Sequence, residues 1–103
     1  MVEESPNAKI LDLGCGSGEF TRMLADKIGT NHVYGVEISD SADIAEEMGI
    51  KVFRSDLNNS LPFKDEVFDF VCANQVIEHL YNTDLFVKEI FRILKEACNH
   101  FNT

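Results

Sequence analysis

Tryptophan is missing from this sequence, proline occurs only twice, and basic residues are half as frequent as acidic ones, nine against eighteen. The formal net charge is therefore -9. A chain this acidic repels phosphate backbones, so we expect no large nucleic-acid surface. The scarcity of proline and the hydrophobic share of 45% indicate a chain that folds around a core rather than a disordered one.

Cysteine is also scarce. The three cysteines, Cys15, Cys72 and Cys98, are widely spaced and form no Cys-x-x-Cys pair, which makes a disulfide framework or a zinc site a poor expectation. No apolar run approaches the roughly 20 residues that span a membrane, and the first residues lack the apolar stretch of a signal peptide. We therefore expect a soluble, cytoplasmic protein with no membrane partner.

What the chain does contain is a regular alternation of short apolar strands and amphipathic helices. Strands are predicted over residues 8–13, 32–38, 51–54 and 68–73, and helices over residues 19–28, 41–48 and 84–97. This alternation predicts right-handed crossovers and a parallel sheet covered on both faces. The 103 residues fit one small α/β domain, residues 1–103.

The spacing of the large apolar residues predicts which face of each helix is buried. The expected inward residues are Phe20, Met23, Leu24 and Ile28 in the first helix, Ile44, Ala45 and Met48 in the second, and Phe86, Ile90, Ile93, Leu94 and Ala97 in the third. Asp84 is the expected N-cap of the third helix.

Each strand is followed by residues suited to a polar ligand. Residues 14–18 read Gly-Cys-Gly-Ser-Gly, and Glu37, Asp56 and the pair Asn74 and Gln75 follow the next three strands. Ligands of open parallel sheets bind at the carboxyl ends of the strands, where the strand order reverses. The ordered set is therefore much stronger evidence for a ligand site than a glycine-rich loop alone.

These residue types suit a nucleoside. Glycines let the backbone turn sharply and approach a ligand. Glu37 is placed to accept hydrogen bonds from both ribose hydroxyls, and Asp56 from the exocyclic amine of adenine. Asp12, just before the loop, could bind a cationic amino group at the other end of the ligand. The alternatives are that Glu37 and Asp56 are solvated loop carboxylates and that Asp12 caps the glycine turn.

Dinucleotide binding is the obvious competitor. Its fingerprint requires glycine at the sixth position of the loop, and counting from Gly14 that position is Glu19. A carboxylate at the start of a helix opposes a pyrophosphate through both its charge and the helix dipole. A cofactor without phosphate is not affected. The loop therefore favours a nucleoside with a zwitterionic tail, such as S-adenosylmethionine, over NAD.

Several motifs resemble those of class I S-adenosylmethionine-dependent methyltransferases. Leu-Asp-Leu-Gly-Cys-Gly-Ser-Gly at residues 11–18 resembles the first motif, and residues 36–39, 55–57 and 68–74 resemble the second to fourth. The sequence between residues 61 and 95 is similar to the small-molecule branch of ubiquinone-type methyltransferases. The resemblance covers roughly residues 8 to 96, and it implies a Rossmann-like three-layer fold.

The resemblance also implies roles for individual residues. Asp12, Gly14 and Gly16 would line the methionine part of the cofactor, and Cys15 belongs to the same loop without a redox role. Glu37 would hold the ribose, Ile38 and Leu57 would pack on the adenine, and Asp56 would take its amine. The main chain of Asn74 and Gln75 would border the sulfonium.

A catalytic base and a metal are less clearly indicated. His79 is a candidate base because imidazole transfers protons near neutral pH, but it could instead orient its loop. Some relatives hold a divalent metal with a Glu-x-x-Glu-His run. Here that run begins with Gln75, and a carboxamide is a weaker ligand for a hard cation, so we expect no metal.

The chain departs from the family after residue 95. Relatives continue with Pro-Gly-Gly and a fifth strand, whereas residues 95–103 read Lys-Glu-Ala-Cys-Asn-His-Phe-Asn-Thr. The resemblance therefore implies four strands in the order 3-2-1-4, with the fourth as an exposed edge. We expect another copy or another polypeptide to cover it.

Three functions follow from this sequence. The leading hypothesis is a methyltransferase that acts on an unknown, small-molecule acceptor. The second is a non-catalytic cofactor-binding module or subunit, and the third an NAD-linked oxidoreductase.

Overall fold

A computed structural model describes residues 6–73 and 80–95 and contains one four-stranded sheet. The strands are β1 (Lys9–Leu13), β2 (His32–Val36), β3 (Lys51–Phe53) and β4 (Phe70–Ala73), in the order β3-β2-β1-β4. All three pairings are parallel. The predicted parallel sheet and its strand order are confirmed.

The register of the sheet brings the carboxyl ends of its strands to one edge. Leu13 of β1 pairs with Val36 of β2 on one side and with Ala73 of β4 on the other. Val36 pairs in turn with Phe53 of β3. Strand β2 ends at Val36, two residues earlier than predicted, so Glu37 and Ile38 lie beyond the strand rather than within it.

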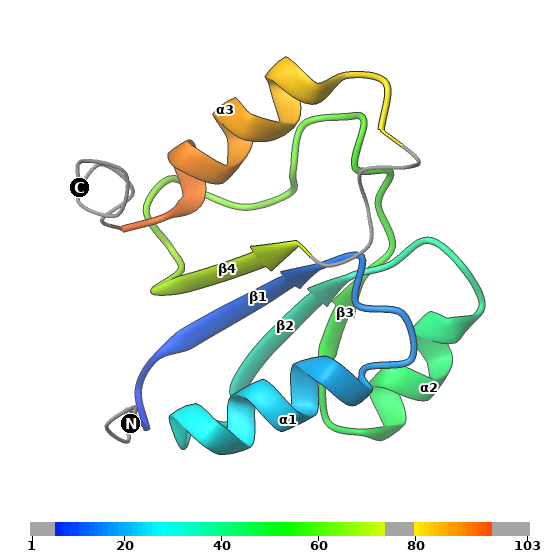
Figure 1. Cartoon of the computed structure of the whole chain (residues 1–103), viewed down its shortest axis with the longest axis vertical. Helices are drawn as coiled ribbons and strands as arrows, with labels where there is room; N and C mark the ends of the chain where they lie inside the picture. The colour runs from blue at the N-terminus through cyan, green and yellow to red at the C-terminus, as the bar shows by residue number, and fades with distance from the viewer. Residues whose placement is uncertain (1–5, 74–79, 96–103) are drawn as a thin grey trace.

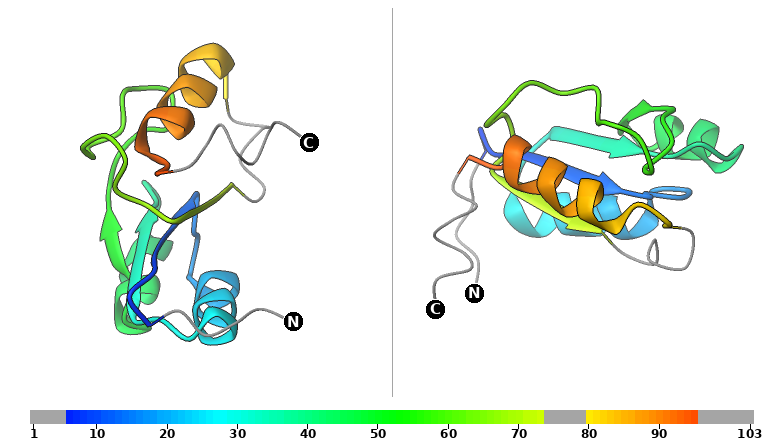
Figure 2. Two further views of the ribbon diagram at one scale, coloured as in Figure 1. Left: turned by 90° about the vertical axis from the view of Figure 1, so that its left-hand side faces the viewer. Right: turned by 90° about the horizontal axis from the view of Figure 1, so that it is seen from above.

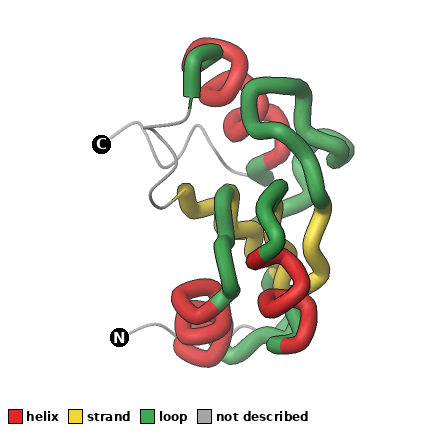
Figure 3. Tube along the Cα trace, turned by 90° about the vertical axis from the view of Figure 1, so that its right-hand side faces the viewer, coloured by secondary structure: helices red, strands yellow, loops and turns green. Residues whose placement is uncertain are grey.

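Helices lie on both faces of the sheet (Figures 1 and 2). α1 (Glu19–Ile28) and α2 (Ser41–Glu47) cover one face, and α3 (Thr83–Ile93) covers the other. The connection from β3 to β4, residues 54–69, is a loop on the same side as α3 (Figure 3). These three layers are the Rossmann-like α/β arrangement predicted above.

Small side chains fill the layer between the sheet and helices α1 and α2. The buried residues of these helices are Thr21, Ala25 and Ile28 in α1, and Ala42 and Ala45 in α2. They lie beside a core cluster that includes Ile10, Val33 and Ile50. The helices therefore lie close to the sheet.

The predicted inward faces of α1 and α2 are partly wrong. Ile28 and Ala45 are buried and Leu24 packs against the core, but Phe20 is 41% exposed and Met23 is 53% exposed. Ile44 and Met48 are also exposed. The buried positions of these helices are taken mostly by alanine and threonine, together with Ile28, and the larger side chains on the neighbouring stripe face solvent.

Aromatic rings fill the layer on the α3 side. Phe63 makes edge-to-face contacts with Phe53 and Phe68, at centroid distances of 4.8 and 4.9 Å, and Tyr34 contacts Phe68 at 5.5 Å. Such pairs add to the stability that the rings gain from burial. The rings join strands β2 and β3 to the loop that precedes β4.

The inner stripe predicted for α3 is confirmed for Phe86, Ile93 and Leu94, which are buried, and Ile90 packs against the same core. Ala97 lies outside the described residues. The predicted N-cap is wrong: the helix begins at Thr83, and the side chain of Asn82 accepts a hydrogen bond from the Leu85 N–H at 3.4 Å. Asp84 lies in the first turn, where its negative charge suits the helix dipole.

Candidate nucleoside-binding site

A cavity of about 320 Å³ opens at the carboxyl edge of the sheet, which is a size typical of small-molecule sites. Six of the residues predicted from the sequence line it: Gly14, Gly16, Glu37, Ile38, Asp56 and Leu57. Val36, Ser55, Asn58 and Leu80 complete the described lining. The predicted site residues Asn74 and Gln75 and the candidate base His79 lie outside the described residues.

The glycine loop is pinned to the end of β2. The N–H groups of Gly14 and Cys15 both donate to the carbonyl of Val36, at 2.7 and 3.1 Å. Gly16 has φ +58°, a left-handed conformation that favours glycine, and a Cβ placed there would meet no atom within 4 Å. The open side of Gly16 leaves room for a ligand to reach the backbone.

Glu37 joins this loop to the segment after β2. Its Oε1 accepts from the Gly16 N–H at 2.7 Å, and its Oε2 accepts from the Ser39 N–H at 3.1 Å. Burial acts to raise the pKa of Glu37, but the hydrogen bonds from Ser39, Gly16 and Ile38 together outweigh it and lower the pKa below its ordinary value. Each carboxylate oxygen has a second lone pair. An ionised Glu37 can therefore hold the loop and still accept hydrogen bonds from a ligand.

Asp56 also lines the cavity. Its Oδ1 accepts from both the backbone N–H and the side-chain amide of Asn58, at 2.9 and 3.0 Å. Both of these hydrogen bonds use one oxygen, so Oδ2 remains as an acceptor for a ligand amine. Leu57 adds an apolar surface beside it.

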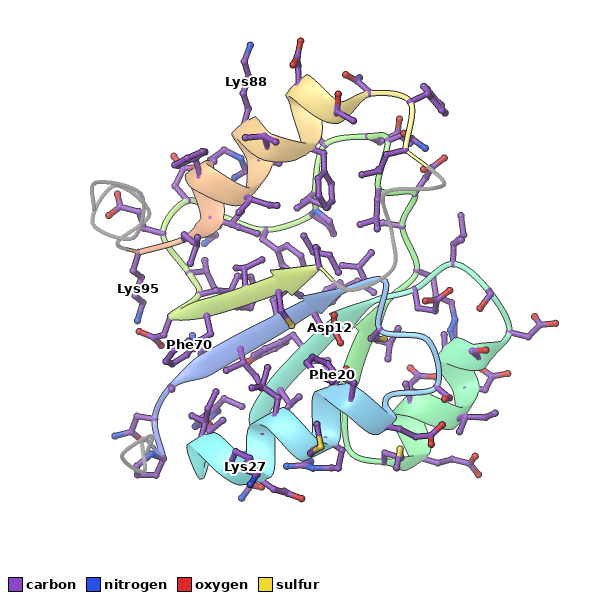
Figure 4. The ribbon with its side chains drawn as sticks, viewed as in Figure 1. Asp12, Phe20, Lys27, Phe70, Lys88 and Lys95 are labelled. Atoms are coloured by element: carbon purple, nitrogen blue, oxygen red, sulfur yellow. The ribbon has the colours of Figure 1, made fainter. Side chains whose placement is uncertain are left out.

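Asp12 is buried beneath the glycine loop, near the end of β1 (Figure 4). The hydroxyl of Thr21 in α1 donates to its Oδ2 at 2.6 Å, whereas Oδ1 has no hydrogen-bond partner within the described part of the chain. Burial is the largest influence on its carboxyl group and raises the pKa of Asp12. Asp12 therefore ties β1 to α1, and its remaining oxygen would be satisfied by a cationic group.

The side chain of Cys15 does not face the cavity. It is buried in the core cluster under α1 and α2, and its Sγ lies only 2.6 Å from where a Cβ added to Gly35 would be. Burial raises the pKa of the Cys15 thiol to about 12, so the thiol stays protonated and unreactive at neutral pH. Only the main chain of Cys15 contributes to the loop.

Four lining residues were not predicted from the sequence. Val36 and Ser55 immediately precede predicted residues, so proximity in sequence could have found them. Asn58 lies two residues after Asp56, a spacing at which an aspartate commonly binds the following backbone. Leu80 has no such signal, because it reaches the cavity from the segment before α3.

The sequence predicted neither a metal site nor a membrane-spanning helix. Residues 6–73 and 80–95 contain no group of three or more His, Cys, Asp or Glu side chains that could hold a metal ion. Within the same part of the chain, no helix has the length and apolar character to cross a membrane.

The fold and the site define a Rossmann-like domain whose cavity suits a nucleoside. An open glycine backbone, two carboxylates in the cavity lining and the unpartnered Asp12 oxygen all fit a nucleoside with a cationic tail. The chain belongs to the S-adenosylmethionine-dependent methyltransferases, because the family described as methyltransferase domain matches residues 11–98.

Sequence similarity to individual proteins supports this assignment. An uncharacterised protein of Methanocaldococcus jannaschii is 41% identical over 93 residues, which are 89% of this chain and 42% of that protein. The mitochondrial ubiquinone biosynthesis O-methyltransferase of Rattus norvegicus is 30% identical over 105 residues, 92% of this chain and 30% of that enzyme.

A solved structure gives the same result. The S-adenosylmethionine-dependent methyltransferase of Thermotoga maritima superposes with a TM-score of 0.72 and 36% identity, over 88% of this chain and 41% of that protein. The chain thus spans less than half the length of these similar proteins.

Proposed function

We propose that this chain binds S-adenosylmethionine and forms the cofactor-binding part of a methyltransferase that acts on a small-molecule acceptor. The observation that carries the proposal is the position of Glu37. Its ionised carboxylate is held by Gly16 and Ser39 in the lining of the cavity, and Asp56 lines the same cavity after the neighbouring strand β3. Two carboxylates in one cavity, at the ends of neighbouring strands, suit the ribose hydroxyls and the adenine amine of adenosine.

The remaining contacts follow from this orientation. Ile38 and Leu57 would contact the two faces of the adenine, and Gly14 and Gly16 would border the methionine part. The unpartnered Oδ1 of Asp12 would accept a hydrogen bond from the ammonium group. Asn74, Gln75 and the main chain of Cys15 remain predicted contacts, and His79 remains the candidate base.

Glu19 supports this ligand over a dinucleotide. It is the first residue of α1, and its Oε1 accepts from the Ser17 hydroxyl in the glycine loop at 2.9 Å. A carboxylate held in this position repels a pyrophosphate. The cationic sulfonium of S-adenosylmethionine carries no such penalty.

When bound, the cofactor supplies an electrophilic methyl group on its sulfonium. The residues of this chain bind and orient the nucleoside so that the methyl group is held in one place. Proximity and orientation of this kind account for much of the rate enhancement in group transfer.

Calorimetric titration with S-adenosylhomocysteine and S-adenosylmethionine tests the proposal. We expect the wild type to bind both, and Glu37→Ala to bind about 10- to 100-fold more weakly, because hydrogen bonds to a charged group are lost. Glu47→Ala is the matched control, because Glu47 is an exposed glutamate of α2. An absence of heat with both ligands, or equal affinity of Glu37→Ala and wild type, would refute the assignment.

We also propose that another copy or another polypeptide covers the outer edge of β4. Among the described strands β4 pairs only with β1, and a hollow of about 300 Å³ between β4 and α3 is lined by Phe70, Val71, Ile90 and Leu94. Light scattering should show association that increases with concentration. A stable monomer at high concentration would contradict this part of the proposal.

The alternative function is a non-catalytic cofactor-binding module. Cofactor binding without methyl transfer to any acceptor would favour that alternative.

We further propose that the protein works in the cytoplasm. Cys15 and Cys72 are free thiols, and burial raises the pKa of each to about 12. Free cysteines of this kind are typical of a reducing compartment.

A further inference from the structure

Asn58 connects two segments of the chain that both line the cavity. Its backbone N–H and its side-chain amide both donate to Asp56 Oδ1, at 2.9 and 3.0 Å. Its Oδ1 accepts from the backbone N–H groups of Tyr81 and Asn82, at 2.9 and 3.3 Å. One side chain thus joins the loop after β3 to the segment that enters α3.

The chemistry of the partners determines the orientation of this amide. The ionised carboxylate of Asp56 only accepts hydrogen bonds, so it requires the NH₂ end of the amide. The N–H groups of Tyr81 and Asn82 only donate, so they require the carbonyl end. The reverse orientation would place oxygen against oxygen and NH₂ against N–H.

The hydrogen bond from the Tyr81 N–H to Asn58 also helps to place Leu80, which packs against the core on the α3 side. Leu80 lines the cavity, whereas the side chain of its neighbour Tyr81 is 81% exposed and contributes little packing. The next residue, Asn82, caps α3 through the Leu85 N–H. The hydrogen bonds from the backbone of Tyr81 and Asn82 to Asn58 therefore restrain this segment together with the packing of Leu80.

We propose that Asn58 is a positioning residue that couples the binding of adenine at Asp56 to the placement of Leu80 and the start of α3. A ligand amine on Asp56 would fix the carboxylate that Asn58 contacts, and Asn58 would in turn hold Tyr81 and Asn82. By linkage, a segment held in place raises the affinity for the ligand, and the ligand stabilises the segment. The inference rests on the proposed function, because the ligand that would contact Asp56 is the proposed cofactor.

Amide hydrogen exchange of Tyr81 and Asn82, measured by NMR with and without saturating S-adenosylhomocysteine, tests the coupling. In the wild type we expect the ligand to slow exchange of both amides by about tenfold. In Asn58→Ala, both amides should exchange about five- to tenfold faster without ligand, and the affinity should fall about tenfold, because hydrogen bonds are lost on both sides.

Two further variants separate this role from a general loss of structure. Asn58→Asp keeps an acceptor for Tyr81 and Asn82 but places a second carboxylate beside Asp56. It should preserve the slow exchange in the free protein and still weaken ligand binding about tenfold. Asn59→Ala is the matched control, because the Asn59 side chain is exposed and its backbone N–H, which the substitution keeps, bonds to Asp56. It should resemble the wild type in both measurements.

The outcomes distinguish the two proposals. If the wild type binds the ligand in calorimetry but the exchange of Tyr81 and Asn82 is unchanged, the coupling is overturned and the cofactor site stands. An Asn59→Ala protein that behaves like Asn58→Ala would also overturn it. If the wild type does not bind at all, the proposed function fails and the coupling fails with it.

Discussion

Alanines and aliphatic side chains fill the space between the sheet and helices α1 and α2, whereas aromatic rings and leucines fill the space between the sheet and α3. On the first side, a Cβ placed on Gly18 would lie 3.1 Å from Ala45 Cβ and 3.2 Å from Ala45 Cα. On the second side, Phe63 contacts Phe53 and Phe68 edge to face. The two faces of one sheet are therefore covered by different kinds of packing.

The cavity has one wall on each side of this division. The glycine loop belongs to the closely packed side, where steric contact leaves it little freedom. The wall formed by Asp56, Leu57 and Leu80 belongs to the α3 side, where rings and polar contacts hold a long loop. The wall formed by the glycine loop is thus positioned by close packing, and the other wall by hydrogen bonds and ion pairs.

A pair of charged residues on α3 supplies those bonds. Glu89 Oε1 accepts from the Leu61 N–H at 2.6 Å, and Arg92 donates to the carbonyls of Phe63 and Leu61, at 2.6 and 3.1 Å. Arg92 also binds Glu89 through its Nε at 2.7 Å and Asp65 at 2.9 Å. The loop after β3 is thus attached to α3 through its backbone.

The largest expected effect is on the aromatic side. Phe68→Ala should lower the free energy of unfolding by about 3–5 kcal/mol, because it leaves a cavity in a ring cluster. Phe68 is 1% exposed, and the matched control Phe70→Ala removes a ring that is 41% exposed. Urea unfolding measures both, with Phe68→Leu as a milder variant if Phe68→Ala does not fold. Equal losses for Phe68→Ala and Phe70→Ala would contradict the comparison.

The second largest effect is expected on the side of the sheet that α1 and α2 cover, where adding one methyl group should destabilise the fold. Gly18→Ala should cost about 2–3 kcal/mol, through left-handed backbone strain and overpacking. Gly18 has φ +89°, and its Cβ would lie 2.5 Å from Ile50 Cδ1. Gly16→Ala is the control, because its φ is +58° with no neighbour within 4 Å, so only the strain remains. Thermal unfolding that ranks Gly16→Ala as the more damaging change would show that this side is not tightly packed.

The third and smallest effect concerns Glu89. Its hydrogen bond with Arg92 is the largest influence and lowers the pKa of Glu89 below the ordinary 4.5, with a further contribution from the Leu61 N–H and opposition from burial. Because the pKa of Glu89 is lowered in the folded state, ionised Glu89 stabilises the fold above pH 4.5. This contribution is lost as the pH falls through the pKa that Glu89 has in the folded protein. Glu89→Gln should therefore lower stability by about 2 kcal/mol at pH 7 and by less in acid.

Urea unfolding at pH 7 and at about pH 3.5, below the ordinary glutamate pKa, measures this difference. Glu46→Gln is the control, because the ion pair of Glu46 with Arg54 is on the surface. Its loss should change the free energy of unfolding by no more than about 0.5 kcal/mol. If Glu89→Gln and wild type differ equally at both pH values, ionised Glu89 does not hold the loop.

Much of this protein is determined by its sequence alone. The alternation of strands and helices, the glycine turn, and Glu37 and Asp56 at successive strand ends are local signals. They suffice because parallel strands of a doubly wound sheet bring their carboxyl ends to one edge, whatever the details of packing. The motifs that resemble methyltransferases lie at those same positions, which is why the family could be predicted.

Only the tertiary structure decided which stripe of α1 and α2 is buried. The helical period allows more than one apolar stripe, and the choice depends on the distance between helix and sheet. In this structure Thr21 and Ala25 are buried, and Phe20 and Met23 are exposed. The Thr21 hydroxyl gains a buried partner in Asp12 as well.

The tertiary structure also decided the far wall of the cavity. Leu80 and Leu57 line the same cavity although they lie far apart in the chain, and the Asn58 amide holds the segment that carries Leu80. Contacts between distant segments depend on how the loop after β3 packs under α3, and no local pattern encodes that path. The sequence determined which strand ends form the site, and the packing of the two faces decided how its walls are held.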